Sequence, residues 1–249
     1  PNAAVRIEDG MIAEISEKPV ANADMSAQGL ILMPGFIDMH GDMVEREVEP
    51  RPNVRMPLEL GLRDLDRRLA VSGVTFSPAS TYGHLRSYEH TSSVIRAIKT
   101  MRDQLLVDHK VHARFEITFP KALAVIEELI AEGSVDLISL NDRTPGQGQY
   151  RNVERHVERL ARDKGTSLEE AAQSIARRIE ERTQPADVMT HTLDAISKAC
   201  HAHGVVIASH DDDTVAKVQL MHSLGVLISE FPVTLEAAAE AKRLGLMNA

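Results

Sequence analysis

His40 and Asp42 are the residues of this chain whose types and spacing point most directly to chemistry. They follow the apolar run 31–33, a Pro-Gly turn and the short apolar run 36–37. On an extended strand, residues i and i+2 point to the same side, so one imidazole and one carboxylate can converge there. Nitrogen and oxygen donors of this kind bind divalent metal ions. His-x-Asp alone would also fit an exposed strand end. Preceded by these apolar runs and the Pro-Gly turn, it predicts a metal site.

Other polar side chains stand at the ends of further predicted strands. His210 directly follows the apolar strand 205–209, and Glu116 lies within the apolar strand 111–119. A carboxylate buried there is costly unless it is paired or metal-bound, so an ion pair with an arginine such as Arg114 is the alternative role for Glu116. We predict the following metal ligands: His40, Asp42, Glu116, His210 and Glu230.

Four acids at strand ends are candidates for the general base, one of which is the candidate ligand Glu230. Asp142 follows the strand 135–140, and a run of three aspartates, 211–213, separates a strand from a helix. Acidic groups before a helix also offset its exposed N–H groups, which is the role expected of Asp213. Asp211 or Asp212 could instead orient His210. The predicted catalytic residues are therefore Asp142, Asp211 and Asp212.

Two loops carry groups suited to an anion. Residues 49–57 form a proline-rich loop with two arginines, and residues 141–150 combine an arginine, two glutamines and glycines. Arginine matches phosphate oxygens bidentately, and glycine lets the backbone approach an anion closely. Ordinary turns with solvated charges are the alternative. We predict the following substrate-binding residues: Arg51, Arg55, Arg143, Gln147 and Gln149.

A repeated alternation of helix, glycine and short strand must position these residues. Most of the expected helices end at a glycine, which adopts the left-handed C′ conformation cheaply. The strands between them are short, β-branched and apolar on both faces, as in parallel sheets covered by helices. An insertion after the strand 135–140 contains a capping-box helix start at 166–169. The expected helices outside this insertion span 56–72, 87–108, 120–132, 187–203, 214–224 and 234–244.

These elements predict an α/β fold with about six βα units. We expect residues 31–249 to form the first six units of a TIM (β/α)8-type barrel, incomplete at its C-terminus, with a doubly wound sheet as the alternative. Residues 1–30 are expected to be part of a small β-sandwich-like domain, because 4–15 form two alternating runs around Asp9-Gly10. The chain begins without methionine and ends where another strand would start, so we expect a piece of a longer protein.

The composition narrows the class of protein. A content of 43% hydrophobic and 26% charged residues over 249 residues suits a globular enzyme, and no long uncharged apolar run or secretory leader is present. The single cysteine, Cys200, suits a reducing cytoplasm. A net charge of −9 with 3% aromatic residues argues against nucleic-acid binding. We therefore expect a cytoplasmic protein without nucleic-acid or membrane partners; a homo-oligomer is left open.

Five segments in order resemble one family. They are similar to the PhnM family of the amidohydrolase superfamily, α-D-ribose 1-methylphosphonate 5-triphosphate diphosphatases of the carbon–phosphorus lyase pathway. The resemblance implies a metal-dependent hydrolase barrel in which His40 and Asp42 are first-strand ligands, Glu116 a metal-binding acid and His210 a later ligand. The chain has Gly41 and Met43 around Asp42, where the family often has Thr and Asn. The matching segments are 32–42, 49–57, 145–149, 208–212 and 230–238.

The predicted function is release of diphosphate from a phosphorylated ribose phosphonate. One or two divalent ions, zinc first with manganese or iron as alternatives, would activate water and stabilise charge on a phosphoryl oxygen, while the arginines hold the polyphosphate. Another amidohydrolase acting on an amide or cyclic amide is the first alternative, although acyl substrates do not need the arginine set. A catalytically inactive barrel with an assembly role is the second.

Overall fold

The structure is a computed structural model that describes two compact units, 1–34 and 35–249. Residues 1–2, 19, 21, 39, 42, 52–53 and 83–87 are not described, nor are the side chains of 76–82 and 88–89. The prediction made for Asp42 therefore lies outside the described residues. Each unit is described by itself.

The first unit contains an antiparallel hairpin of β1 (Ala4–Glu8) and β2 (Met11–Ser16). Its turn residues Asp9 and Gly10 have φ angles of 52° and 76°, as a type I′ turn requires. The hairpin expected around Asp9-Gly10 is thus confirmed. That residues 1–30 are part of a small β-sandwich-like domain stays a prediction.

The second unit is built on a seven-stranded parallel sheet in which every strand pairs with the next one along the chain. This order is that of a (β/α) barrel, whereas a doubly wound sheet reverses its strand order at a switch point. Among the described residues no pairing closes the last strand onto the first. The predicted α/β fold with a parallel sheet is confirmed, and a complete barrel is not. The strands are β3 (Phe36–Ile37), β4 (Val74–Tyr82), β5 (Asp108–Glu116), β6 (Leu137–Asn141), β7 (Val206–His210), β8 (Ile228–Glu230) and β9 (Met247–Asn248).

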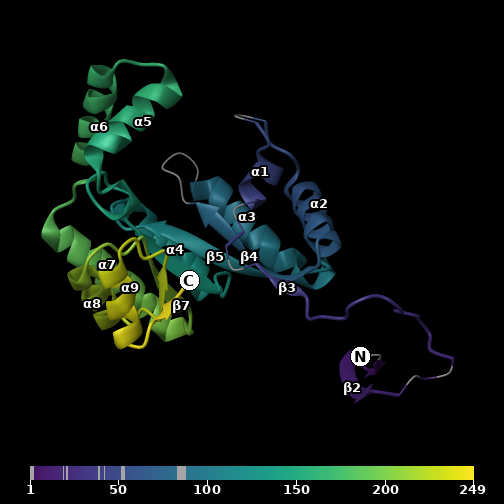
Figure 1. Ribbon diagram of the computed structural model, residues 1–249. Helices are drawn as coiled ribbons and strands as arrows, with labels where there is room; N and C mark the ends of the chain where they lie inside the picture. Colours follow the sequence, from purple (N-terminus) through teal and green to yellow (C-terminus); the bar gives the residue numbers. More distant parts are fainter. Residues whose placement is uncertain are drawn as a thin grey trace. The chain divides into compact units, whose positions relative to one another are not determined.

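Helices follow most strands, and α5 and α6 form a pair that stands away from the sheet (Figure 1). In the part of the chain that is described, no helix is both long and apolar enough to cross a lipid bilayer. The helices are α1 (Val44–Val48), α2 (Leu58–Val71), α3 (Tyr88–Met101), α4 (Leu123–Ala131), α5 (Val153–Lys164), α6 (Leu168–Arg182), α7 (Ala186–His203), α8 (Val215–Ser223) and α9 (Leu235–Arg243).

The helix before β5 differs most from its predicted bounds. The helix expected over 87–108 ends at Met101, and β5 begins at Asp108. The buried carboxylate of Asp66 accepts hydrogen bonds from the backbone N–H groups of Leu106 and Val107, which fixes the chain in an extended entry to β5. The capping box of α6 is formed by Ser167 and Glu170, one residue later than the predicted start.

The two faces of β5 differ in polarity. Val111, Ala113 and Phe115 are buried in the hydrophobic cluster together with side chains of α3, α4 and α7. Because strand side chains alternate between faces, the intervening residues point to the other side of the sheet. The intervening residues are His112, Arg114 and Glu116, so this inner face of β5 is polar.

Two consecutive strand–loop–helix units share the same local geometry at a spacing of 20 residues. β7 and β8 are each followed by a non-glycine residue with positive φ, Asp211 at 55° and Phe231 at 51°. α8 and α9 are each capped by a threonine side chain, Thr214 and Thr234. The two units therefore present the last residues of their strands in equivalent positions.

Candidate metal centre

Three side chains from distant parts of the second unit converge on one point. His40, His112 and Glu230 each offer one ligand atom, and these atoms lie within 4.8 Å of one another. His40 Nδ1 lies 3.6 Å from Glu230 Oε1, and His112 Nε2 lies 3.5 Å from Glu230 Oε2. His112 and Glu230 are buried, and His40 is half-buried. We call these three residues the metal group.

Each member of the metal group is held by its local structure. Asp38 accepts a hydrogen bond of 3.0 Å from the backbone N–H of His40, a turn that sets the chain direction after β3. His112 lies on the polar face of β5, and Glu230 is the last residue of β8. The rings of His40 and His112 meet edge to face with centroids 5.4 Å apart.

The electrostatics of the site put His112 and Glu230 in states that can bind a cation. Burial lowers the pKa of His112 to about 4, against the opposing effect of the nearby Glu230 charge. Burial raises the pKa of Glu230, but the hydrogen bond with His40 and the positive charges that His112, His40 and His210 carry when protonated outweigh it, so the net shift is downward. At neutral pH His112 is neutral and Glu230 is ionised, as metal ligands must be.

Several buried polar atoms around the group lack a hydrogen-bond partner. Both ring nitrogens of His112, Glu230 Oε2 and His210 Nε2 are buried, and none of them has a hydrogen-bond partner among the described residues. Buried polar atoms are nearly always paired, so this concentration needs an explanation. Two imidazoles and a carboxylate are also a donor set that divalent zinc accepts. The residues present fit a metal ion.

His210 lies beside the metal group. It ends β7 in register with Glu230, and its ring centroid is 6.0 Å from that of His40. Phe231 packs against both rings, with centroid distances of 5.2 Å to His40 and 5.4 Å to His210. His210 Nδ1 lies 3.2 Å from Asp211 Oδ2. An Nδ1–H donated to this carboxylate leaves Nε2 as the nitrogen with a free lone pair.

The structure does not bring Glu116 into the metal group. Its Oε2 forms an ion pair of 3.2 Å with Arg182, and its Oε1 accepts hydrogen bonds from Thr118 and from the backbone N–H of Arg143. Glu116 therefore has the alternative role considered for it, an ion pair with an arginine. The arginine is Arg182 of α6 and not Arg114. The separation has a simple cause, since Glu116 lies four residues, about 13 Å, beyond His112 on the same strand.

The aspartates hold loops together. The buried Asp212 accepts hydrogen bonds from the hydroxyls of Ser209 and Ser229, and Lys217 Nζ lies 3.6 Å from its other oxygen. Asp142 accepts a 3.0 Å hydrogen bond from the backbone N–H of Thr144. These contacts place Asp212 between β7 and β8 and Asp142 in a local turn. The general-base role predicted for them stays a prediction.

Asp211 is the aspartate most closely linked to the histidines. Burial raises the pKa of Asp211, but hydrogen bonds with His210 and Gln149 and the charge of Lys217 together lower it by more, so the net shift is downward. Gln149 Nε2 donates to Asp211 Oδ2 at 2.8 Å. Asp211 is thus an ionised bridge between His210 and the loop 141–150.

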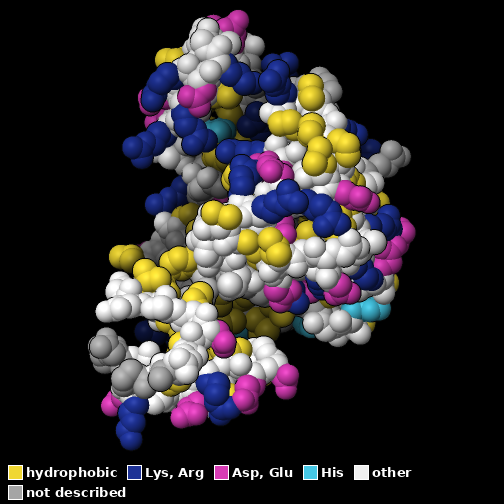
Figure 2. Space-filling model, turned by 90° about the vertical axis from the view of Figure 1, so that its right-hand side faces the viewer, with side chains coloured by type: hydrophobic (Ala, Val, Ile, Leu, Met, Phe, Trp, Pro, Cys, Tyr) yellow, Lys and Arg dark blue, Asp and Glu magenta, His cyan; other side chains and the backbone are white. Residues whose placement is uncertain are grey.

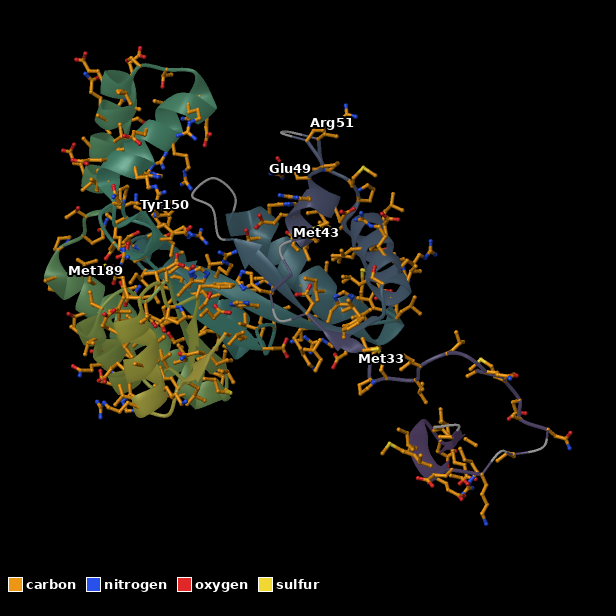
Figure 3. The ribbon with its side chains drawn as sticks, in the orientation of Figure 1. Met33, Met43, Glu49, Arg51, Tyr150 and Met189 are labelled. Atoms are coloured by element: carbon orange, nitrogen blue, oxygen red, sulfur yellow. The ribbon has the colours of Figure 1, made fainter. Side chains whose placement is uncertain are left out.

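The residues predicted to bind substrate lie on separate loops. Arg51 and Arg55 are exposed after α1, and Arg55 Nε lies 3.6 Å from Glu49. Arg143 is half-buried after β6, where it donates to Asn141 Oδ1. Gln147 is half-buried, and Gln149 contacts Asp211. Figure 3 shows Arg51 and Tyr150, the neighbour of Gln149, on different loops and apart.

His112 is the member of the metal group that the sequence reasoning missed. No role is predicted for it from the sequence. The signal that could have found it is the alternation of β5, in which His112 shares the polar face with Glu116.

Comparisons with known proteins connect the chain to one relative. No family model matches. The α-D-ribose 1-methylphosphonate 5-triphosphate diphosphatase of Escherichia coli (strain K12) is 30% identical over 257 residues, which cover 98% of this chain and 66% of that protein. The chain thus spans slightly less than two thirds of the length of this relative.

Two solved structures are weakly similar. One is a lactonase template engineered for organophosphate hydrolysis, with 13% identity, coverage of 89% of this chain and 66% of that chain, and a TM-score of 0.44. The other is a variant of the organophosphorus hydrolase of Deinococcus radiodurans, with 14% identity, coverage of 92% and 69%, and a TM-score of 0.45. These likenesses are too weak to bear on fold or chemistry. The match to the Escherichia coli diphosphatase relates the chain to the PhnM family.

Proposed function

We propose that the protein is a metal-dependent hydrolase that releases diphosphate from α-D-ribose 1-methylphosphonate 5-triphosphate. The observation that carries this proposal is the convergence of the metal group, in which both ring nitrogens of His112 and Glu230 Oε2 are buried without a hydrogen-bond partner among the described residues, in a chain related to a protein named for this reaction. Because the chain spans 66% of that relative, its substrate enters here as part of the proposal.

The metal group would hold a divalent ion through His40, His112 and Glu230. When bound there, the ion would lower the pKa of a water molecule and stabilise negative charge on a phosphoryl oxygen. Zinc is the first choice for two imidazoles and a carboxylate, with manganese or iron as alternatives. Asp42 was predicted as a further ligand from sequence alone.

The chain's own groups prepare this site for a phosphate ester. Asp211 orients His210 through Nδ1 and so presents its Nε2 for ligation or proton transfer. We propose Asp211 as a positioning residue, because both His210 and Gln149 engage its carboxylate. Arg143 is the predicted phosphate-binding arginine that lies on the loop contacting Glu116.

The experiment replaces one member of the metal group and measures metal content and hydrolysis together. We expect His112→Ala to lose both bound metal and release of diphosphate, because the site then retains one imidazole and one carboxylate. His222→Ala, on the exposed surface of α8, is the matched control and should retain both.

Two outcomes would contradict the proposal. Undiminished hydrolysis by metal-stripped protein would remove the need for the metal group. Hydrolysis of a cyclic amide but not of the triphosphate by the metal-loaded protein would support the amidohydrolase alternative.

A further inference from the structure

A cavity of about 560 Å³ lies along α5, outside the metal group. This volume is within the usual range for small-molecule sites. Its wall consists of residues from the end of the loop 141–150 and from α5. Apart from Gln149 and Asn152, the lining residues are Tyr150, Arg151, Arg155, His156, Arg159 and Arg162.

Four arginines face this cavity without a carboxylate among its lining residues. Their spacing of four, four and three residues places them on one side of α5 and its N-terminal extension. None of the four pairs with a carboxylate in the described part of the chain, although other arginines do. Like charges at this spacing repel each other and weaken a helix. An anion in the cavity would remove this repulsion.

The wall of the cavity is ordered by contacts between its own side chains. The rings of Tyr150 and His156 lie 4.7 Å apart, and the Arg159 guanidinium lies 5.6 Å from the centre of the Tyr150 ring. Arg159 also lies 3.3 Å from His156 Nδ1. Figure 2 shows Lys and Arg side chains gathered on the upper lobe, which α5 and α6 form at the top of Figure 1. In a chain of net charge −9, this is a local concentration of positive charge.

Hydrogen bonds connect the cavity wall to the loop that follows His210. Gln149, part of the cavity wall, donates to Asp211, which in turn contacts His210. The backbone N–H of Gly148 donates to Asp213 at 2.7 Å. Hydrogen bonds therefore link the cavity wall to Asp211, whose carboxylate contacts His210 beside the metal group.

We infer that this cavity binds the diphosphate end of a polyphosphorylated substrate. The inference rests on the proposed function, because diphosphate is the group that the proposed reaction releases. Guanidinium groups bind phosphate oxygens through two parallel hydrogen bonds, and several arginines suit two linked phosphates better than a single one. The N-terminus of α5, which Asn152 caps, adds a favourable field for anions.

The test measures binding of inorganic diphosphate and of orthophosphate to the purified protein by calorimetry. We expect diphosphate to bind more tightly than orthophosphate. Replacing Arg155 and Arg159 together by glutamine should weaken diphosphate binding by about tenfold or more, since each lost charge-assisted hydrogen bond is worth about 1.5 kcal/mol or more. Arg177→Gln, an exposed arginine of α6 outside the cavity lining, is the matched control and should bind as the parent does.

The design separates this inference from the proposed function. His112→Ala should lose metal and hydrolysis but keep the arginine-dependent binding of diphosphate. A protein that binds diphosphate through Arg155 and Arg159 but hydrolyses no triphosphate would refute the proposed function and retain the anion site. Unchanged diphosphate binding in the double variant with a native circular-dichroism spectrum, or equal affinities for diphosphate and orthophosphate, would overturn the inference.

Discussion

Asp211 combines an unusual backbone conformation with two contacts of its carboxylate. Its φ of 55° lies in the left-handed region, which costs an ordinary residue about 1–2 kcal/mol and which aspartate and asparagine tolerate best. Its side chain contacts His210 and Gln149. Strain of this kind at a strand end beside candidate ligands is consistent with a positioning role.

Two substitutions of Asp211 separate its charge from its conformation. We expect Asp211→Asn to fold with nearly unchanged stability but to reduce kcat/KM by about 10–100-fold, as is common when the partner of a ligand histidine is lost. Asp211→Ala should add a loss of stability, because alanine is strained at this φ. Hydrolysis rates and thermal unfolding of both variants test this. Full activity of Asp211→Asn would contradict the positioning role.

At the scale of residues, the sequence predicted part of the metal group. His40 and Glu230 follow apolar strands, so strand-end reasoning found them. His112 lies inside a strand, and only recognition of which face of β5 is polar could have selected it. The partner of Glu116 comes from α6, 66 residues later, and no local pattern specifies such a pair.

The repeated unit of strand, loop and helix provides a controlled comparison between elements. Gly225 and Gly245 end the two units with φ angles of 81° and 84°. A Cβ at Gly245 would meet nothing within 4 Å, whereas a Cβ at Gly225 would collide with the ring of His201. The two positions therefore differ in space but hardly in backbone conformation.

We expect both glycine-to-alanine variants to lose stability through their left-handed φ, by about 1–2 kcal/mol for Gly245→Ala. Gly225→Ala should lose more, because the His201 ring must move. The excess should disappear when His201→Ala is combined with it. Denaturant unfolding of the two glycine variants, of His201→Ala and of the double variant measures these differences. Equal losses at Gly225 and Gly245 would show that the His201 contact does not affect stability.

At the scale of elements, the periodicity predicted most helices and the glycines that end them. The helices after β7 and β8 were expected over 214–224 and 234–244 and are Val215–Ser223 and Leu235–Arg243. The helix before β5 was predicted too long, because Asp66, about 40 residues away, fixes the chain there. A tertiary contact overrides local helix propensity in such a case.

For the whole molecule, the metal group joins β5 and β8, two non-adjacent strands, to the segment after β3. A metal ion that binds only the folded state stabilises it, by about 2.7 kcal/mol at a hundredfold excess over Kd. We expect zinc to raise the Tm of metal-stripped protein and a chelator to reverse this. The His112→Ala variant should show no such shift. An identical Tm with and without zinc in the parent would contradict a metal site in this group.

At this scale the sequence predicted an α/β fold and a barrel type of connectivity. The consecutive strand order agrees with that connectivity, but closure of a sheet depends on pairing between its first and last strands. These strands are the most distant in sequence, and no local pattern encodes their pairing. The cavity along α5 was not predicted either, because the sequence pattern predicted only part of the insertion in which it lies.

The equivalence of the two repeated units has a consequence for metal selectivity. His210 and Glu230 are register partners at the last positions of β7 and β8, so one repeat supplies an imidazole where the other supplies a carboxylate. Exchanging one for the other changes the hardness of the donor set while the surrounding backbone stays the same. Softer nitrogen donors favour zinc and iron, and additional oxygen donors favour manganese or magnesium. In the proposed metal site, the duplicated scaffold would thus let a single substitution at His210 or Glu230 change the preferred metal.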